Sequence, residues 1–135
     1  MTTHCVNYAD LLGLPFAYGG RGPDQFDCYG VAIELCRRHG VILPDYTSSD
    51  DPTRQGELFA DGVSRYCLRV DQPQPLDIAL FRLGKGHWHC GVVVDGYDRF
   101  VHIMERSSVS CEELHDPVWG PRLVGVYRFI GGPRD

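Results

Sequence analysis

The feature that most constrains this sequence is the separation of its helical and strand-like patterns along the chain. The clearest helical pattern ends at Gly40, whereas the chain after residue 75 holds runs rich in Val, Ile, Tyr and Phe. Glycine-rich turns separate these runs, as is typical of antiparallel strands. Helices followed by strands favour an α+β fold, in which a helical layer packs on an antiparallel sheet. The predicted strands are residues 76–83, 88–94, 100–104 and 123–130.

The predicted central helix spans residues 28–39. Asp27 directly precedes it and is a residue type that accepts hydrogen bonds from backbone N–H groups at a helix start. Apolar residues recur at helical spacing and form one stripe that would face a core. Gly30 weakens the first turn, so its presence predicts that another segment approaches the backbone closely there. Shorter helices are predicted at residues 7–14 and 56–66. The stripe comprises Val31, Ala32, Leu35 and Cys36.

The bulk composition fits one globular domain that covers residues 1–135. Hydrophobic residues make up 43% of the chain and charged residues 23%, as in ordinary soluble proteins. The net charge is -5 and the basic residues are scattered, so nucleic acid is not an expected partner. No apolar run reaches the roughly 18 residues of a membrane span. Residues 1–10 lack the basic and apolar regions of a secretory signal. We therefore expect synthesis in the cytoplasm, where the protein either stays or leaves by a route other than a cleaved signal.

One of the six cysteines stands apart by its position. Irregular spacing, and a chain long enough to bury its own core, favour reduced thiols over a disulfide framework. Cys28 begins the predicted helix, where backbone N–H groups and the helix dipole favour a thiolate. The thiolate is the reactive form, so Cys28 is the candidate nucleophile. The plainer alternative is a buried cysteine that happens to begin a helix.

A candidate base opens the second predicted strand. After this strand, Asp95-Gly96 is a strong signal for a two-residue hairpin turn. With that turn, Val94 faces Tyr97, and His89 lies opposite His102, about 5 Å away on the same face of the sheet. His89 would take the thiol proton and His102 would hold its ring, as in a catalytic triad. A longer loop would shift this register, and two ordinary semi-buried histidines remain the alternative.

A metal site is the other chemical interpretation of this region. His87, His89, Cys90 and His102 are zinc-compatible ligands. However, His89 and Cys90 are neighbours in a predicted strand, so their side chains point to opposite faces. The motifs C-x-x-C and H-E-x-x-H are absent from the sequence. We therefore expect neither a metal nor a cofactor.

Several short motifs, taken together in chain order, resemble the NlpC-like cell-wall cysteine peptidases, which have a compact papain-like fold. The resemblance runs from about Leu11 to Phe129. Each motif is short, and their order makes the resemblance specific. The motifs are Tyr18-Gly19-Gly20, Phe26-Asp27-Cys28-Tyr29-Gly30, Gly40-Val41-Ile42-Leu43-Pro44, Pro75-Leu76-Asp77-Ile78-Ala79, His89-Cys90-Gly91-Val92-Val93-Val94 and Phe100-Val101-His102.

The resemblance implies catalytic roles for four residues. Cys28 matches the family nucleophile, His89 the base and His102 the third, polar residue. Tyr18 matches a tyrosine near the oxyanion site, where the backbone N–H of Cys28 would be the other donor. The implied reaction is hydrolysis of a peptide bond in the peptidoglycan stem peptide through an acyl-enzyme. Arg21 is a candidate partner for a carboxylate of that substrate.

Two positions depart from the common family pattern. Tyr29 stands where a serine usually follows the nucleophile, and Cys90 where a valine usually follows the base. The aromatic residue, together with residues 22–24 and 43–46, looks more like versions carried in bacteriophage tail gene clusters. Other tail proteins are therefore candidate partners, and the virion tail is a candidate location.

Two further functions stay open because a fold does not determine a substrate. One is a non-enzymatic structural protein of a phage tail. The other is a Cys-His acyltransferase or deamidase that acts on another substrate.

Overall fold

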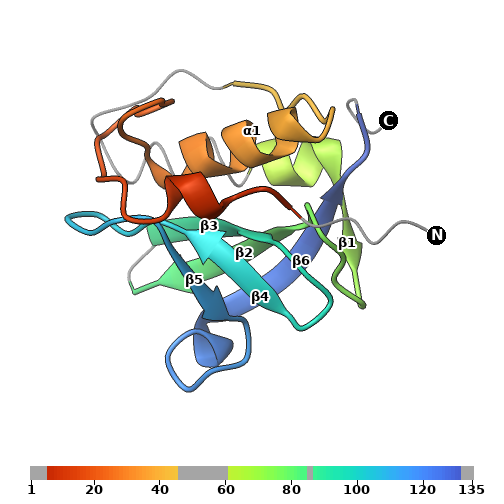
Figure 1. Cartoon of the computed structure of the whole chain (residues 1–135). Helices are drawn as coiled ribbons and strands as arrows, with labels where there is room; N and C mark the ends of the chain where they lie inside the picture. Colours follow the sequence, from red (N-terminus) through yellow and green to blue (C-terminus); the bar gives the residue numbers. More distant parts are fainter. Residues whose placement is uncertain (1–5, 46–60, 85–86, 132–135) are drawn as a thin grey trace.

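One long helix lies across an antiparallel sheet in the computed structural model, which describes residues 6–45, 61–84 and 87–131 (Figure 1). Helix α1 spans Cys28–Arg38, and the 3-10 helices η1 and η2 span Ala9–Leu11 and Gly120–Arg122. This arrangement confirms the predicted α+β class. The strands are β1 (Cys67–Val70), β2 (Ile78–Leu83), β3 (His87–Val93), β4 (Arg99–His102), β5 (Ser110–Glu113) and β6 (Leu123–Phe129).

The sheet has the strand order β1-β6-β2-β3-β4-β5, and every pair of neighbours is antiparallel. Strands β2 to β5 follow one another in sequence order, while β6 returns between β1 and β2. The four predicted strands correspond to β2, β3, β4 and β6. The sequence did not predict β1 and β5, which are four residues each. In β5, Cys111 is the one apolar residue, so no alternation marks this strand.

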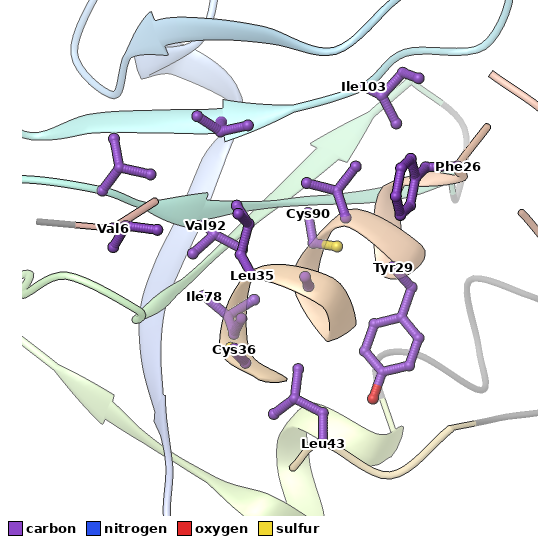
Figure 2. Packing of buried hydrophobic residues seen from close by; sticks show 14 of the residues in the cluster. Val6, Phe26, Tyr29, Leu35, Cys36, Leu43, Ile78, Cys90, Val92 and Ile103 are labelled. Atoms are coloured by element: carbon purple, nitrogen blue, oxygen red, sulfur yellow. The ribbon is translucent and has the colours of Figure 1, made fainter. Parts of the chain in front are cut away.

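The sheet is buried on both faces by two separate apolar clusters. On the helix side, Leu35 and Cys36 of α1 pack with Ile78 of β2 and Val92 of β3 (Figure 2). The opposite face has a second cluster, which includes Trp119, the residue directly before η2. Because side chains alternate between the faces of a strand, a doubly covered strand has a continuous apolar run, and this explains the sequence of β2 and β3. The second cluster comprises Ala79, Phe81, Val93, Phe100, Leu114, Trp119 and Val126.

The start of α1 is organised by Asp27, as predicted from its position. Its Oδ1 accepts a hydrogen bond from the backbone N–H of Gly30 at 2.6 Å and another from the guanidinium of Arg21 at 2.7 Å. Its Oδ2 accepts one from the backbone N–H of Gly19 at 3.2 Å. One carboxylate therefore caps the helix and holds the preceding loop against it.

The predicted close approach at Gly30 comes from the same loop. A methyl group at Gly30 would overlap the carbonyl oxygen of Gly20. That carbonyl also accepts a hydrogen bond from the backbone N–H of Asp27 at 3.1 Å. Any larger residue at position 30 would therefore clash with the loop, which crosses the first turn of the helix there.

The two shorter predicted helices have different outcomes. The helix predicted at residues 7–14 is wrong, because only Ala9–Leu11 form a 3-10 turn, and Gly13 then adopts a positive φ of 88°. Of the helix predicted at residues 56–66, residues 61–66 are helical, and residues 56–60 lie outside the described part. Within the described ranges, no helix has the length and apolar character that crossing a membrane requires.

We expect Gly30→Ala to lower the free energy of unfolding by roughly 1–3 kcal/mol, because the added methyl group must displace the Gly20 carbonyl. Urea unfolding followed by circular dichroism measures this change. Gly96→Ala is the matched control, since open space surrounds that position, and its effect should stay within about 0.5 kcal/mol. Equal stability of the two variants would contradict the close packing at Gly30.

Candidate active site

Two buried histidines from neighbouring strands form a direct hydrogen bond. His89 of β3 is 4% exposed and His102 at the end of β4 is 1% exposed. Nε2 of His89 lies 2.8 Å from Nδ1 of His102. The structure therefore brings together the two histidines that the sequence predicted to be neighbours.

The predicted register between these strands is wrong by two residues. Val92 pairs with Val101, whereas the two-residue turn would have placed Gly91 opposite Phe100. The loop is longer because the carboxylate of Asp95 accepts a hydrogen bond from the backbone N–H of Tyr97 at 2.8 Å. Since strand side chains alternate with a period of two, a shift of two residues leaves each side chain on its original face. The two histidines consequently remain on one face, as diagonal neighbours.

A carboxylate and an indole continue the chain of hydrogen bonds beyond His102. Nε2 of His102 lies 2.5 Å from Oε2 of Glu112 on β5, and Nε1 of Trp119 donates to the same oxygen at 3.0 Å. The Trp119 ring stacks on His89 with a centroid distance of 5.4 Å and meets His102 edge-on at 4.6 Å. Aromatic packing and hydrogen bonds thus hold both imidazoles.

The hydrogen-bond partners decide which ring nitrogens carry protons. Burial and the nearby positive charge of His89 lower the pKa of His102 to about 4, although its bond to Glu112 acts in the opposite direction. His102 is therefore neutral at pH 7 and carries one ring proton. An ionised carboxylate only accepts, so that proton is on Nε2, and Nδ1 accepts from His89 Nε2–H. This leaves Nδ1 of His89 as the nitrogen available to accept a proton from Cys28.

Cys28 is the first residue of α1, and its surroundings favour the thiolate. A hydrogen bond from the Cys90 thiol is the largest influence that lowers the pKa of Cys28. A hydrogen bond and positive charge from His89, and the backbone N–H of Cys90, lower it further. Burial acts in the opposite direction, but the pKa of Cys28 remains well below that of an ordinary thiol. By contrast, burial raises the pKa of Cys36, on the same helix, to about 12.

His89 and Cys90 both reach Cys28 although they are neighbours in β3. The ladder between β3 and β4 comprises Val92↔Val101 and Val93↔Phe100, and it stops short of Cys90. On its other side this part of β3 pairs with β2, where Cys90 lies opposite Leu80. The Cys90 side chain points from β3 toward the helix (Figure 2). Beyond the end of that ladder, Cys28 interacts with the side chain of His89 and with both the thiol and the backbone of Cys90.

Tyr18 and Arg21 lie in the loop that Asp27 holds. The Tyr18 side chain is solvent-exposed, packs edge-on against Phe16 and hydrogen-bonds through its hydroxyl to Glu105. Arg21 forms ion pairs with Asp27 at 2.7 Å and with Asp45 at 3.0 Å. The predicted roles of these two residues with substrate therefore remain predictions.

Sequence reasoning did not find Glu112 or Trp119 as parts of this site. It noted Cys90 as a zinc-compatible residue and as a departure from the family, without linking it to Cys28. Glu112 lies on the unpredicted strand β5, and Trp119 lies in the loop before η2. No spacing links either residue to His102. Among the described residues, no group of three or more His, Cys, Asp or Glu side chains is arranged to hold a metal ion.

We expect Cys90→Val to raise the pKa of Cys28, because valine fills the buried position with apolar atoms but removes a hydrogen-bond donor to a charged group. The measurement is the pH dependence of Cys28 alkylation by iodoacetamide, followed by mass spectrometry. The midpoint should move to higher pH. Cys36→Val, a buried change in the same cluster, should leave the midpoint in place. An unchanged midpoint in Cys90→Val would show that the thiol does not stabilise the thiolate.

Comparison with known proteins gives a consistent family assignment. A family model described as the NlpC/P60 family matches residues 13–128. The probable endopeptidase p60 of Listeria grayi is 30% identical over 117 residues, which are 87% of this chain and 20% of that protein. The probable peptidoglycan endopeptidase LytE of Bacillus subtilis is 25% identical over 120 residues, which are 88% of this chain and 31% of that protein. The chain thus spans a third or less of the length of these relatives.

Solved structures of the same family share the fold. An NlpC/P60 family protein from Bacillus cereus superposes with a TM-score of 0.62 and 24% identity, over 94% of this chain and 41% of that chain. The NlpC/p60 domain of the peptidoglycan hydrolase SagA gives a TM-score of 0.56 and 19% identity, over 93% of this chain and 100% of that chain. These similarities confirm the predicted papain-like α+β fold. Because the family model covers most of the chain and the relatives agree with it, this protein belongs to the NlpC/P60 family.

Proposed function

We propose that this protein is a cysteine peptidase that hydrolyses a peptide bond of the peptidoglycan stem peptide. The observation that carries the proposal is the hydrogen-bonded pair of His89 and His102 beside Cys28, whose pKa is lowered. Relatives that are named endopeptidases, one of them a peptidoglycan endopeptidase, support the substrate class. The reaction needs no cofactor.

The geometry supports an acyl-enzyme mechanism. The Cys28 thiolate attacks the carbonyl carbon of the scissile bond, and a thioester forms as the amine leaves. His89 carries the proton from the thiol to the leaving amine, and then removes a proton from the water that hydrolyses the thioester. His102 accepts from His89 Nε2–H throughout, so the His89 ring keeps Nδ1 directed at the sulfur.

Donors for the developing oxyanion would come from the start of α1. The backbone N–H of Cys28 belongs to the first turn, whose N–H groups are not all used within the helix. Tyr18 is the second proposed donor, because its loop is held against the same turn through the hydrogen bond from Gly19 to Asp27. Its hydroxyl would have to exchange the contact with Glu105 for the substrate oxygen.

The stem peptide carries carboxylates, and Arg21 would have to release Asp45, which is more exposed than Asp27, to bind one of them. A location in a phage tail, and other tail proteins as partners, remain predictions from the sequence.

We expect Cys28→Ala to reduce hydrolysis of purified peptidoglycan by at least about a thousandfold, since it removes the nucleophile. Mass spectrometry of the released fragments measures the rate and identifies the bond. Cys111→Ala, which changes another partly buried thiol, should retain full activity. Undiminished hydrolysis by Cys28→Ala would refute the mechanism, and transfer of the acyl group to an added amine in preference to water would favour an acyltransferase.

We expect His89→Ala to slow alkylation of Cys28 near neutral pH, because the lost hydrogen bond and positive charge had lowered the pKa of Cys28. In the wild type the thiolate forms above this lowered pKa, so alkylation should be fast well below the ordinary midpoint of about 8.5. In the variant the midpoint should rise. A wild-type midpoint near that of an ordinary thiol would favour a non-enzymatic structural protein.

A further inference from the structure

The hydrogen bonds of the site extend beyond the cysteine and the two histidines. In the β4–β5 ladder, His102 pairs with Ser110 and Phe100 pairs with Glu112. Ser110 and Glu112 are two positions apart, so they lie on the face of the sheet that His102 occupies. Glu112 is thus a diagonal neighbour of His102, and its Oε2 lies 2.5 Å from Nε2 of that histidine.

Two further contacts hold this carboxylate and the imidazole that it meets. Trp119 donates through Nε1 to the same Oε2 at 3.0 Å, and its indole is only 5% exposed. The centroid of the Phe100 ring lies 4.6 Å from that of the His102 imidazole. The Glu112 side chain is 37% exposed while that of His102 is 1% exposed. The chain of hydrogen bonds therefore runs from a carboxylate near the surface to a buried imidazole.

The acceptor at the end of this chain sets the direction of every hydrogen bond in it. A neutral imidazole has one N–H and one acceptor nitrogen. If His102 carried its proton on Nδ1, it would point this N–H at Nε2 of His89. His89 would then have to carry its own proton on Nδ1, which would block the nitrogen that faces Cys28. With an ionised carboxylate at Nε2 of His102, the opposite order is enforced and Nδ1 of His89 stays open.

We propose that Glu112 is a positioning residue of the site, which selects the tautomer and orientation of His102, and that Trp119 holds Glu112 in place. The proposal rests on the proposed function insofar as it concerns turnover. Its structural part, the tautomer of His102 and the basicity of His89, holds whether or not peptidoglycan is the substrate. Glu112 acts through His102 and touches no reacting atom.

Substitutions at Glu112 separate the effect of its negative charge from that of its hydrogen-bond acceptor. Glu112→Gln retains an oxygen that accepts from both His102 and Trp119 but loses the charge, whereas Glu112→Leu loses both. Glu113 offers a matched control, because it is adjacent on β5, exposed and directed to the other face of the strand. Trp119→Phe keeps an aromatic ring but removes the N–H donor to Glu112. Urea unfolding identifies the variants that remain folded.

The first measurement needs no substrate. Nitrogen-15 NMR of the histidine rings should show His102 protonated on Nε2 in the wild type, and a mixture of tautomers in Glu112→Leu. The groups that face His102 are His89 from β3, Glu112 from β5 and Cys28 from α1. Loss of the carboxylate makes His102 a weaker acceptor and destabilises the protonated His89. The alkylation midpoint of Cys28 should therefore move to higher pH in Glu112→Leu, and by less in Glu112→Gln and Trp119→Phe.

The second measurement is peptidoglycan hydrolysis. We expect Glu112→Leu to lower kcat roughly tenfold or more, because an imidazole in the wrong tautomer or orientation weakens the catalytic base, with little change in KM. Glu113→Leu should leave kcat, the His102 tautomer and the alkylation midpoint unchanged. The proposal is overturned if Glu112→Leu behaves like Glu113→Leu. If the leucine variant does not fold, the same conclusion follows when Glu112→Gln and Trp119→Phe both behave like Glu113→Leu. If the tautomer and midpoint shift while the wild type hydrolyses no peptidoglycan, the positioning role stands and the proposed substrate fails.

Discussion

The carboxylate of Asp27 accepts hydrogen bonds from the loop before α1 and from the first turn of the helix itself. This double attachment determines where the helix begins, and hence where Cys28 lies. Burial raises the pKa of Asp27, while the hydrogen bond from Arg21 and that from the Gly30 N–H act against this rise. The cap therefore depends on the loop as much as on the helix. Gly30, where a side chain would overlap the loop, is part of the same arrangement.

From that point the site is assembled across the end of a strand ladder. The β3–β4 ladder stops short of Cys90, and the first turn of α1 meets β3 there. The Cys90 thiol is fully buried, and its hydrogen bond to Cys28, together with burial, raises the pKa of Cys90 well above the ordinary value. Cys90 thus remains protonated and donates, while Cys28 carries the negative charge. The two cysteines have different roles because one is at a helix start and the other is inside the core.

The sequence was informative where the chemistry is local. The hydrogen bond by which Asp27 caps α1 and the apolar stripe of the helix depend on residues within a few positions of one another. The close approach at Gly30 was predicted from the cost of glycine in a helix, and the structure identifies its partner as the Gly20 carbonyl. The pairing of His89 with His102 was predicted through an incorrect register, and it survived because an error of two residues does not change the face of a strand. An error of one residue would have placed the two histidines on opposite faces. The papain-like fold was predicted from the resemblance of the ordered motifs to a known family. The family model that matches residues 13–128 confirms that resemblance.

By itself, then, the sequence determined the α+β class, the position of Cys28 at the start of the helix and the common face of His89 and His102. It could do so because helix periodicity, capping and strand alternation are short-range rules. Tertiary structure alone decided that Glu112 and Trp119 meet His102, and that Cys90 shares a hydrogen bond with Cys28. These contacts join segments that are far apart in the chain or that follow no periodic pattern. They depend on strand order, on loop lengths and on the packing of aromatic rings. A short stretch of sequence does not reveal these features, because each of them depends on interactions between distant segments.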